Sequence, residues 1–159
     1  MRLLKMLTHI LVCILLGFTA LESAAKSTQF NKQVWHDVKK QNLNENWIAV
    51  FWSLECPPCF KELKIISQML KVNSDLKVVL INTDSDDEIK QEIDKIINEY
   101  ELNTLALLHF ADEQAMQSRY IVDPTWYGEL PRSYFFNKKG QSQGRSGLVD
   151  KLILQEWLN

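Results

Sequence analysis

The sequence is poor in cysteine, and its charges nearly cancel. It has three cysteines in 159 residues, and 18 basic residues against 20 acidic ones leave a formal net charge of −2. So small a charge favours neither a nucleic acid nor an anionic membrane surface as a partner. A single Cys-x-x-Cys pair without a second ligand pair argues against structural zinc. The acidic run from Asp84 to Glu88 lacks the ligand spacing of a calcium loop, and we expect it to start a helix.

Residues 1–25 have the pattern of a secretory signal peptide. Arg2 and Lys5 form a basic start, an apolar core follows over residues 10–21, and small residues at 23–25 offer a cleavage site. Retention as an N-terminal membrane anchor is the alternative, because the apolar stretch is nearly long enough to span a bilayer. We therefore expect an exported protein.

Cleavage would leave two cysteines that stand three residues apart. Cys13 would be removed with the signal, while Cys56 and Cys59 would remain in a mature domain of residues 26–159. The sequence is 46% hydrophobic, which suffices for one domain with a buried core. One close cysteine pair in an oxidising compartment indicates a redox centre and not a disulfide framework.

This pair stands where a strand is expected to end and a helix to begin. The apolar run Trp47–Trp52 predicts a buried strand, and Leu63, Ile66 and Leu70 then repeat at helical spacing. The first turn of a helix has N–H groups without intrahelical partners, and its dipole favours negative charge. Such a place lowers the pKa of a thiol and so favours the reactive thiolate.

Two prolines between the cysteines sharpen this prediction. With Cys56 as the N-cap, Pro57 takes the first helical position, which suits proline, and Pro58 likewise has no N–H. The amide of Cys59 is then the nearest donor to the Cys56 sulfur. We therefore expect Cys56 to be the more exposed, attacking thiol and Cys59 to be the more buried, resolving thiol.

Strand and helix signals alternate along the chain, which predicts an α/β domain with parallel crossovers. Further strands are expected over residues 76–81, 105–108, 133–136 and 141–146, and further helices within residues 30–38, 85–100, 111–120 and 148–158. Ser85 and Glu88 form a possible capping box for the second of these helices. The last two strands flank a turn in which Gly140 is free to take positive φ, so they form a hairpin.

The residues around the pair carry a family resemblance. The pattern Phe-Trp-x-x-x-Cys-x-Pro-Cys-x-x-Glu is matched by Phe51, Trp52, Cys56, Pro58, Cys59 and Glu62. In this the chain resembles thioredoxin-fold proteins, and more closely the TlpA-like periplasmic thiol–disulfide oxidoreductases. The resemblance covers most of the chain after residue 45. It implies a thioredoxin-like α/β fold, with a central mixed sheet flanked by helices and with a C-terminal β-hairpin and helix.

The resemblance also implies a function. A TlpA-like protein in the periplasm would reduce disulfides of partner proteins through a Cys56–Cys59 redox disulfide, without cofactor or metal, and a membrane electron donor would re-reduce it. Disulfide oxidases and isomerases share the motif, so the direction of electron flow stays open. A copper-binding module is the alternative of another class, in which the dithiol would hold the metal with help from His109 or a methionine.

Several residues are assigned to the substrate surface by the same resemblance. Pro131 stands where thioredoxin-like proteins carry a cis-proline that faces the disulfide, and Leu130 before it is expected to shape that surface. The other residues expected there are Trp52, Pro57 and Pro58. Trp126 and Tyr127, just upstream, either rim the same groove or pack against the core.

Proton transfer is assigned to Glu62. Val50 stands where thioredoxin has a buried acid, and Glu62, one helical turn beyond Cys59, is the substitute that the TlpA-like pattern implies. The alternative is a solvated glutamate on the helix surface. Glu55 replaces the tryptophan common before the first cysteine, and its carboxylate either opposes a thiolate on Cys56 or is solvated and without effect.

Overall fold

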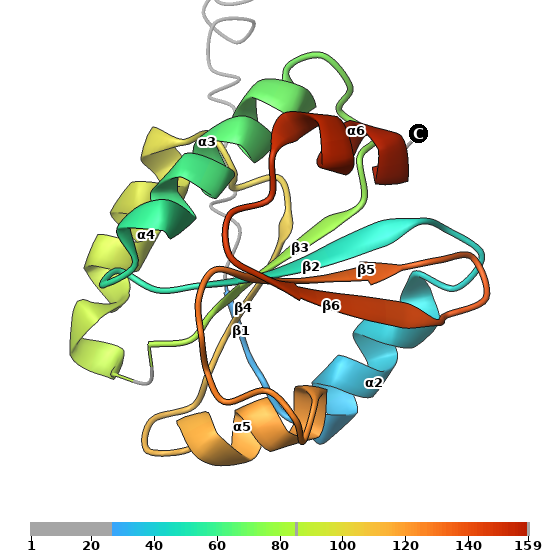
Figure 1. The fold of residues 1–159 in the computed structure, drawn as a ribbon. Coiled ribbons are helices and arrows are strands. Elements are labelled where there is room, and N and C mark those ends of the chain that lie inside the picture. The colour runs from blue at the N-terminus through green and yellow to red at the C-terminus, as the bar shows by residue number, and fades with distance from the viewer. Residues whose placement is uncertain (1–26, 85, 159) are drawn as a thin grey trace, which may run out of the picture.

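A computed structural model describes residues 27–84 and 86–158 of the chain (Figure 1). The predicted signal peptide or anchor at residues 1–25 lies outside this part, and so does Ser85 of the predicted capping box. In the residues described, no helix combines the length and the apolar composition needed to cross a membrane.

A six-stranded mixed sheet forms the centre of the molecule, in the order β1-β4-β3-β2-β5-β6. The strands are β1 (Thr28–Gln29), β2 (Trp47–Trp52), β3 (Val78–Asn82), β4 (Ala106–His109), β5 (Arg132–Phe136) and β6 (Ser142–Ser146). The first four in spatial order are parallel, β5 is antiparallel to its neighbour β2, and β6 is antiparallel to β5. The predicted thioredoxin-like α/β fold with a C-terminal hairpin and helix is confirmed.

Helices cover both faces of this sheet (Figure 1). They are α2 (Lys32–Gln41), α3 (Pro57–Leu70), the 3₁₀ turn η1 (Asp87–Ile89), α4 (Lys90–Glu99), α5 (Ala115–Val122) and α6 (Lys151–Leu158). One face packs against α3, α4 and α6, and the other packs against α2 and α5. The central strands β2 and β3 are therefore enclosed between two apolar layers, as expected for parallel strands joined by helical crossovers, whereas the outer strands β1 and β6 are exposed.

Strand β2 lies between the two apolar layers, and all six of its residues are buried. Its side chains alternate, with Ile48, Val50 and Trp52 facing α3 while Trp47, Ala49 and Phe51 face α2. Burial on both faces explains why the strand reads as a continuous apolar run and not as an alternating one.

The register of the sheet decides which loops meet. Strand β3 runs parallel to β2 with Asn82 opposite Trp52, and β5 runs antiparallel to β2 with Arg132 opposite Phe51. The ends of β2 and β3 and the start of β5 therefore lie at one edge of the sheet, which we call the carboxyl edge. Three segments that are distant in sequence, the loops after residues 52 and 82 and the loop before residue 132, come together there.

The structure corrects several sequence-based boundaries, among them the start of α6 at Lys151 and not at 148, and the span of β3 at Val78–Asn82 and not 76–81. Strand β1 was not predicted, because two residues are too short to show a periodic pattern. Helix α5 begins at Ala115 and not at 111, because a turn with Glu113 at φ 55° precedes it. Helix α4 begins at Lys90, after η1, and not at residue 85. The hairpin turn agrees with expectation, with Gly140 at φ 73°.

Candidate active site

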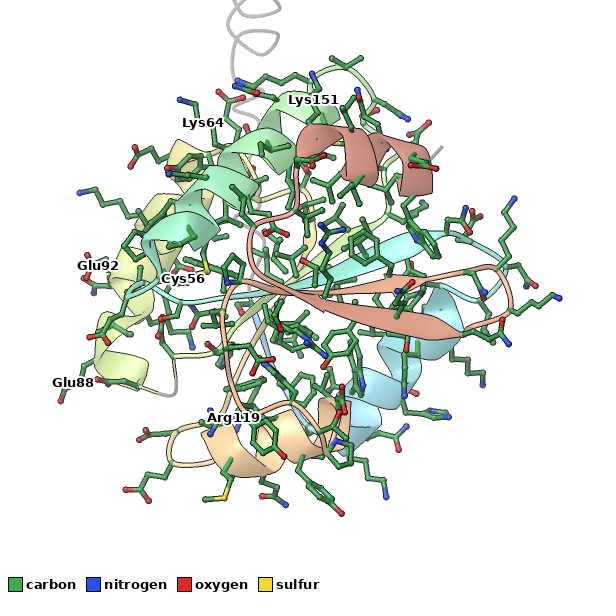
Figure 2. All side chains as sticks on the ribbon, in the orientation of Figure 1. Cys56, Lys64, Glu88, Glu92, Arg119 and Lys151 are labelled. Carbon is green, nitrogen blue, oxygen red and sulfur yellow. A yellow bond between two sulfur atoms is a disulfide. The ribbon has the colours of Figure 1, made fainter. Side chains whose placement is uncertain are left out.

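Cys56 and Cys59 form a disulfide at the carboxyl edge, with their Cα atoms 5.3 Å apart. Cys56 is the N-cap of α3, and prolines occupy the first two helical positions, as predicted. Figure 2 shows Cys56 at the start of this helix. Cys56 is 7% exposed and Cys59 is 1% exposed, which confirms their expected order, although both are buried.

The predicted contact between the Cys59 amide and the Cys56 sulfur is not made in the disulfide form. The Cys59 N–H instead donates to the carbonyl oxygen of Cys56 at 2.9 Å, and the N-cap side chain accepts no capping hydrogen bond. The sulfur is engaged in the disulfide, and the carbonyl oxygen is the better acceptor of the two. The negative charge that this helix start favours would therefore arise only after reduction.

Glu62 is a buried carboxyl group, so the alternative of a solvated surface glutamate is wrong. Its side chain is 0% exposed, and the Ser133 hydroxyl donates to Oε1 at 2.7 Å. The backbone N–H of Val149 donates to Oε2 at 3.3 Å. Burial raises the pKa of the Glu62 carboxyl above its ordinary value, and the two hydrogen bonds oppose that rise.

The carboxyl group of Glu62 reaches the face of the sheet on which Val50 lies. Val50 pairs with Ser133 across β2 and β5, so their side chains point to the same face. Thioredoxin has its buried acid at the strand position that Val50 occupies, whereas here an acid on α3 bonds to the residue opposite. A buried acid is therefore present, but it comes from the helix.

The peptide bond between Leu130 and Pro131 is cis, as predicted from the resemblance. Pro131 immediately precedes β5, so it lies at the carboxyl edge with the cysteine loop. Pro131 is buried, and Leu130 is partly buried against the apolar cluster that contains both cysteines. Pro57 and Pro58 are exposed, so they can form part of a surface around the disulfide.

Trp52 and Trp126 belong to the core and do not line a surface. Trp52 is 1% exposed and packs edge-on against Phe60, so its expected contact with substrate does not fit its placement. Strand β2 is buried on both faces along its whole length, and this includes Trp52 at its end. Trp126 is 4% exposed and donates its indole N–H to the Glu129 carbonyl, whereas Tyr127 beside it is 92% exposed.

Asp84 is a site residue that sequence reasoning missed. Its Oδ1 accepts a hydrogen bond from the Ser53 hydroxyl at 2.6 Å, and its Oδ2 accepts one from the Leu54 N–H at 2.8 Å. The side-chain amide of Asn82 donates to Oδ2 at 3.0 Å. Asp84 thus ties the loop before Cys56 to the end of β3. The sequence pattern assigns the whole acidic run from Asp84 to Glu88 to a helix start. Nothing in the neighbouring residues marks Asp84 as different from the rest of that run.

Arg132, next to the cis-proline, is the second such residue. Its guanidinium pairs with Asp123 at 3.3 Å and with Glu129 at 3.4 Å, and it donates to the Ser146 hydroxyl at 2.7 Å. It also lies 4.7 Å from the centre of the Tyr134 ring. These contacts join the segment around Pro131 to the end of α5 and to β6. Sequence reasoning missed Arg132 because its partners come together only through the register of the strands.

Two further polar candidates remain, Glu55 directly before Cys56 and His109 on β4. Glu55 is exposed. His109 shares a 2.9 Å hydrogen bond with the Ser27 hydroxyl at the β1–β4 side of the sheet. Within residues 27–84 and 86–158, no group of three or more His, Cys, Asp or Glu side chains is arranged to hold a metal ion.

Comparison with known proteins agrees with this geometry. The sequence pattern of the AhpC/TSA family matches residues 21–143. Among curated proteins, the chain is 24% identical over 124 residues to the sporulation thiol-disulfide oxidoreductase A of Bacillus subtilis, covering 76% of this chain and 71% of that protein.

Solved structures with the same fold include StoA from Bacillus subtilis, with a TM-score of 0.55 and 23% identity over 74% of this chain and 85% of that one. A secreted Mycobacterium tuberculosis disulfide oxidoreductase, described as homologous to Escherichia coli DsbE, has a TM-score of 0.56 and 19% identity over 75% and 84% of the two chains. A thiol-disulfide interchange protein DsbE from Chlorobium tepidum has a TM-score of 0.54 and 18% identity over 74% and 80%.

Proposed function

The chain belongs to the AhpC/TSA family, and we propose that this thioredoxin-like thiol–disulfide oxidoreductase is an exported, TlpA-like reductase of protein disulfides. The observation that carries the proposal is the Cys56–Cys59 disulfide at the start of α3, at the same sheet edge as Pro131. The name of the Bacillus subtilis relative agrees with this class of reaction.

In the proposed cycle the reduced protein attacks a disulfide of a partner protein. The Cys56 thiolate forms a bond to one partner sulfur and displaces the other as a thiolate. Cys59 then attacks the Cys56 sulfur of this mixed disulfide, and the second partner sulfur leaves. Two electrons pass to the partner, and the Cys56–Cys59 disulfide is left behind. A membrane donor then returns the two electrons and restores the dithiol.

Glu62 is the proposed acceptor of the proton that Cys59 must lose before it attacks. It lies three residues beyond Cys59 on α3, one helical turn away, and both side chains are buried. Burial raises the pKa of Glu62 towards the range in which a carboxyl group can accept and return a proton. With a buried base near the buried thiol, the proton can be transferred without bulk water entering the site.

Export rests on residues 1–25, whose sequence pattern is that of a signal peptide or an N-terminal anchor. The Mycobacterium tuberculosis neighbour is itself described as secreted. A periplasmic location would supply both the oxidised protein substrates and the membrane donor that the cycle requires. Leu130, Pro57 and Pro58 are the proposed contacts with substrate around the disulfide.

Reduction of insulin disulfides in the presence of a small dithiol tests the proposal. The wild-type protein should accelerate it, and Cys56→Ser should abolish the acceleration, because the attacking sulfur is gone. Normal turnover by Cys56→Ser would refute the assignment of Cys56. Equilibrium with glutathione gives the direction of electron flow, since a strongly negative reduction potential is typical of a reductase and a much higher one of an oxidase.

A further inference from the structure

The hydrogen bonds of Asp84 continue as far as the backbone of Cys56. The Ser53 hydroxyl, which donates to Asp84, accepts from the Glu55 N–H at 3.1 Å. The Ser53 carbonyl oxygen accepts from the Cys56 N–H at 3.3 Å. Each backbone N–H from Leu54 to Cys56 therefore has its acceptor either on the Asp84 carboxylate or on Ser53, whose hydroxyl is held by that carboxylate.

The network is itself anchored in the sheet. Asn82, the last residue of β3, is 2% exposed, and its side-chain oxygen accepts from the Asp84 N–H at 3.0 Å. The N–H of Thr83 donates to the Trp52 carbonyl oxygen at 2.9 Å. Hydrogen bonds to a charged acceptor in a partly buried place are stronger than neutral ones. Asp84 therefore fixes the loop to a rigid element.

The chain on the other side of Cys56 has fewer such bonds. Pro57 and Pro58 have no N–H, so the first backbone donor after Cys56 is the N–H of Cys59. When the disulfide is open, Cys56 also loses its covalent bond to Cys59. The position of the Cys56 backbone then depends on the network that precedes it.

We propose that Asp84 is a positioning residue for the dithiol, which keeps the Cys56 sulfur within reach of Cys59 while the bond between them is open. The step that it serves is closure of the mixed disulfide. The Cys59 thiolate attacks the Cys56 sulfur, the Cys56–Cys59 bond forms, and the bond from Cys56 to the partner sulfur breaks. The partner leaves as a thiolate and takes a proton from water.

Closure is intramolecular, so both its rate and its equilibrium depend on the effective concentration of the Cys59 thiol at the Cys56 sulfur, and small displacements have large effects. Loss of the Asp84 carboxylate would leave the Ser53 hydroxyl and the Leu54 N–H without their acceptor. The loop would then sample other positions, the effective concentration of the two thiols would fall, and the equilibrium would shift from the closed disulfide towards the mixed disulfide. The inference rests on the redox activity of the proposed function, but not on the direction of electron flow.

Glutathione gives a direct measurement. The purified protein is equilibrated with a fixed ratio of reduced to oxidised glutathione, acid-quenched, and examined by intact-mass spectrometry and peptide mapping. We expect Asp84→Ala to carry about ten times more glutathione on Cys56 than the wild type does, relative to the closed disulfide. Asp94→Ala is the matched control. It removes an exposed carboxylate that lines the same small cavity as Asp84, and it should leave the ratio unchanged.

A purely structural role for Asp84 would lower the melting temperature without changing this ratio in the folded protein. The ratio is therefore measured well below the melting temperature, with near-ultraviolet circular dichroism as the check on folding. Equal ratios in Asp84→Ala and Asp94→Ala would overturn the proposal. If Asp84→Ala does not fold, Ser53→Ala removes one hydrogen bond to the carboxylate, and an unchanged ratio there overturns it equally.

This test is independent of the proposed function at one important point. A wild-type protein that fails to reduce insulin, or whose potential is that of an oxidase, would refute the proposed reductase. The glutathione ratio of Asp84→Ala against wild type would still be readable, because it requires only that the cysteine pair exchange with a thiol.

Discussion

The Ser133 hydroxyl donates a 2.7 Å hydrogen bond to the Glu62 carboxyl group, and both side chains are 0% exposed. The two residues are 71 positions apart in sequence and come from different layers, α3 and β5. A carboxyl group in such a place resists ionisation unless its oxygens are hydrogen-bonded. Burial raises the pKa of the acid that we assign to proton transfer, and this contact is the larger of the two hydrogen bonds that oppose the rise.

The first prediction concerns stability against pH. Because burial raises the pKa of Glu62 above its ordinary value of 4.5, the folded protein holds this proton more tightly than the unfolded chain does. The stability that results is fully present below pH 4.5 and is lost as the pH rises through the folded pKa. We expect the free energy of unfolding of the wild type, minus that of Glu62→Gln, to fall as the pH rises above 4.5.

Urea unfolding at a series of pH values from 4 to 8 measures this difference. Glu99→Gln, which replaces an exposed glutamate of α4, is the control for the loss of one carboxylate. A difference that rises with pH would contradict the raised pKa of Glu62.

The second prediction concerns Ser133. Ser133→Ala removes a hydrogen bond that favours the charged carboxylate, so the pKa of Glu62 should rise further. If Glu62 accepts the Cys59 proton, the pH profile of insulin reduction should move upwards by roughly one pH unit, since hydrogen bonds to charged groups are worth about 1.5 kcal/mol or more.

The double variant with Glu62→Gln is the control for this shift. In the Glu62→Gln background the serine has no carboxylate to stabilise, so Ser133→Ala should no longer move the profile. Ser133→Thr keeps the hydroxyl and should leave the profile in place. An equal shift in the presence and absence of the carboxyl group would show that Ser133 acts by another route.

The part of the site that is formed by neighbouring residues, around Cys56 and Cys59, could be predicted from the sequence alone. The strand run before Cys56 and the helical repeat after Cys59 set the start of α3, and the prolines fix its first turn. All of these signals lie within a few residues of each other. The cis-proline and Glu62 followed from the family resemblance and not from local physics, and the structure bears out the cis bond and buries the glutamate.

The partners of these residues could not be predicted, because they depend on strand register. Nothing near Ser133 indicates that its hydroxyl faces Glu62, and nothing near Asp84 indicates that it accepts from Leu54, 30 residues earlier. The expected surface role of Trp52 also depended on the fold. The resemblance assigned Trp52 to the substrate surface, whereas β2 is enclosed on both faces and even its last side chain is buried.

The third prediction concerns Gly144, which lies on β6 against Arg132. A Cβ atom at this position would collide with the Arg132 guanidinium and would lie 2.9 Å from Cε1 of Tyr134. Because overpacking forces side chains out of their preferred positions, we expect Gly144→Ala to lower the free energy of unfolding by about 1–3 kcal/mol. Urea unfolding measures it, and Ser142→Ala on the same strand is the control.

Removal of the arginine tests the cause of that loss. In an Arg132→Ala background the added methyl group has room, so Gly144→Ala should cost much less there than in the wild type. An equal loss in both backgrounds would mean that the guanidinium is not what excludes a side chain at residue 144.

The fourth prediction separates the roles of the two sulfurs. Cys56 is 7% exposed at the helix start, whereas Cys59 is 1% exposed one turn further on, so a bulky protein disulfide can reach Cys56 far more readily. In Cys59→Ser the first exchange proceeds but nothing displaces the partner, so complexes joined through Cys56 should accumulate. In Cys56→Ser the remaining thiol is shielded, and such complexes should be absent. Non-reducing gels of alkylated cell extracts measure both, with the double serine variant as the blank. Complexes in Cys56→Ser and none in Cys59→Ser would reverse the assignment, and Cys59 would then be the attacking thiol.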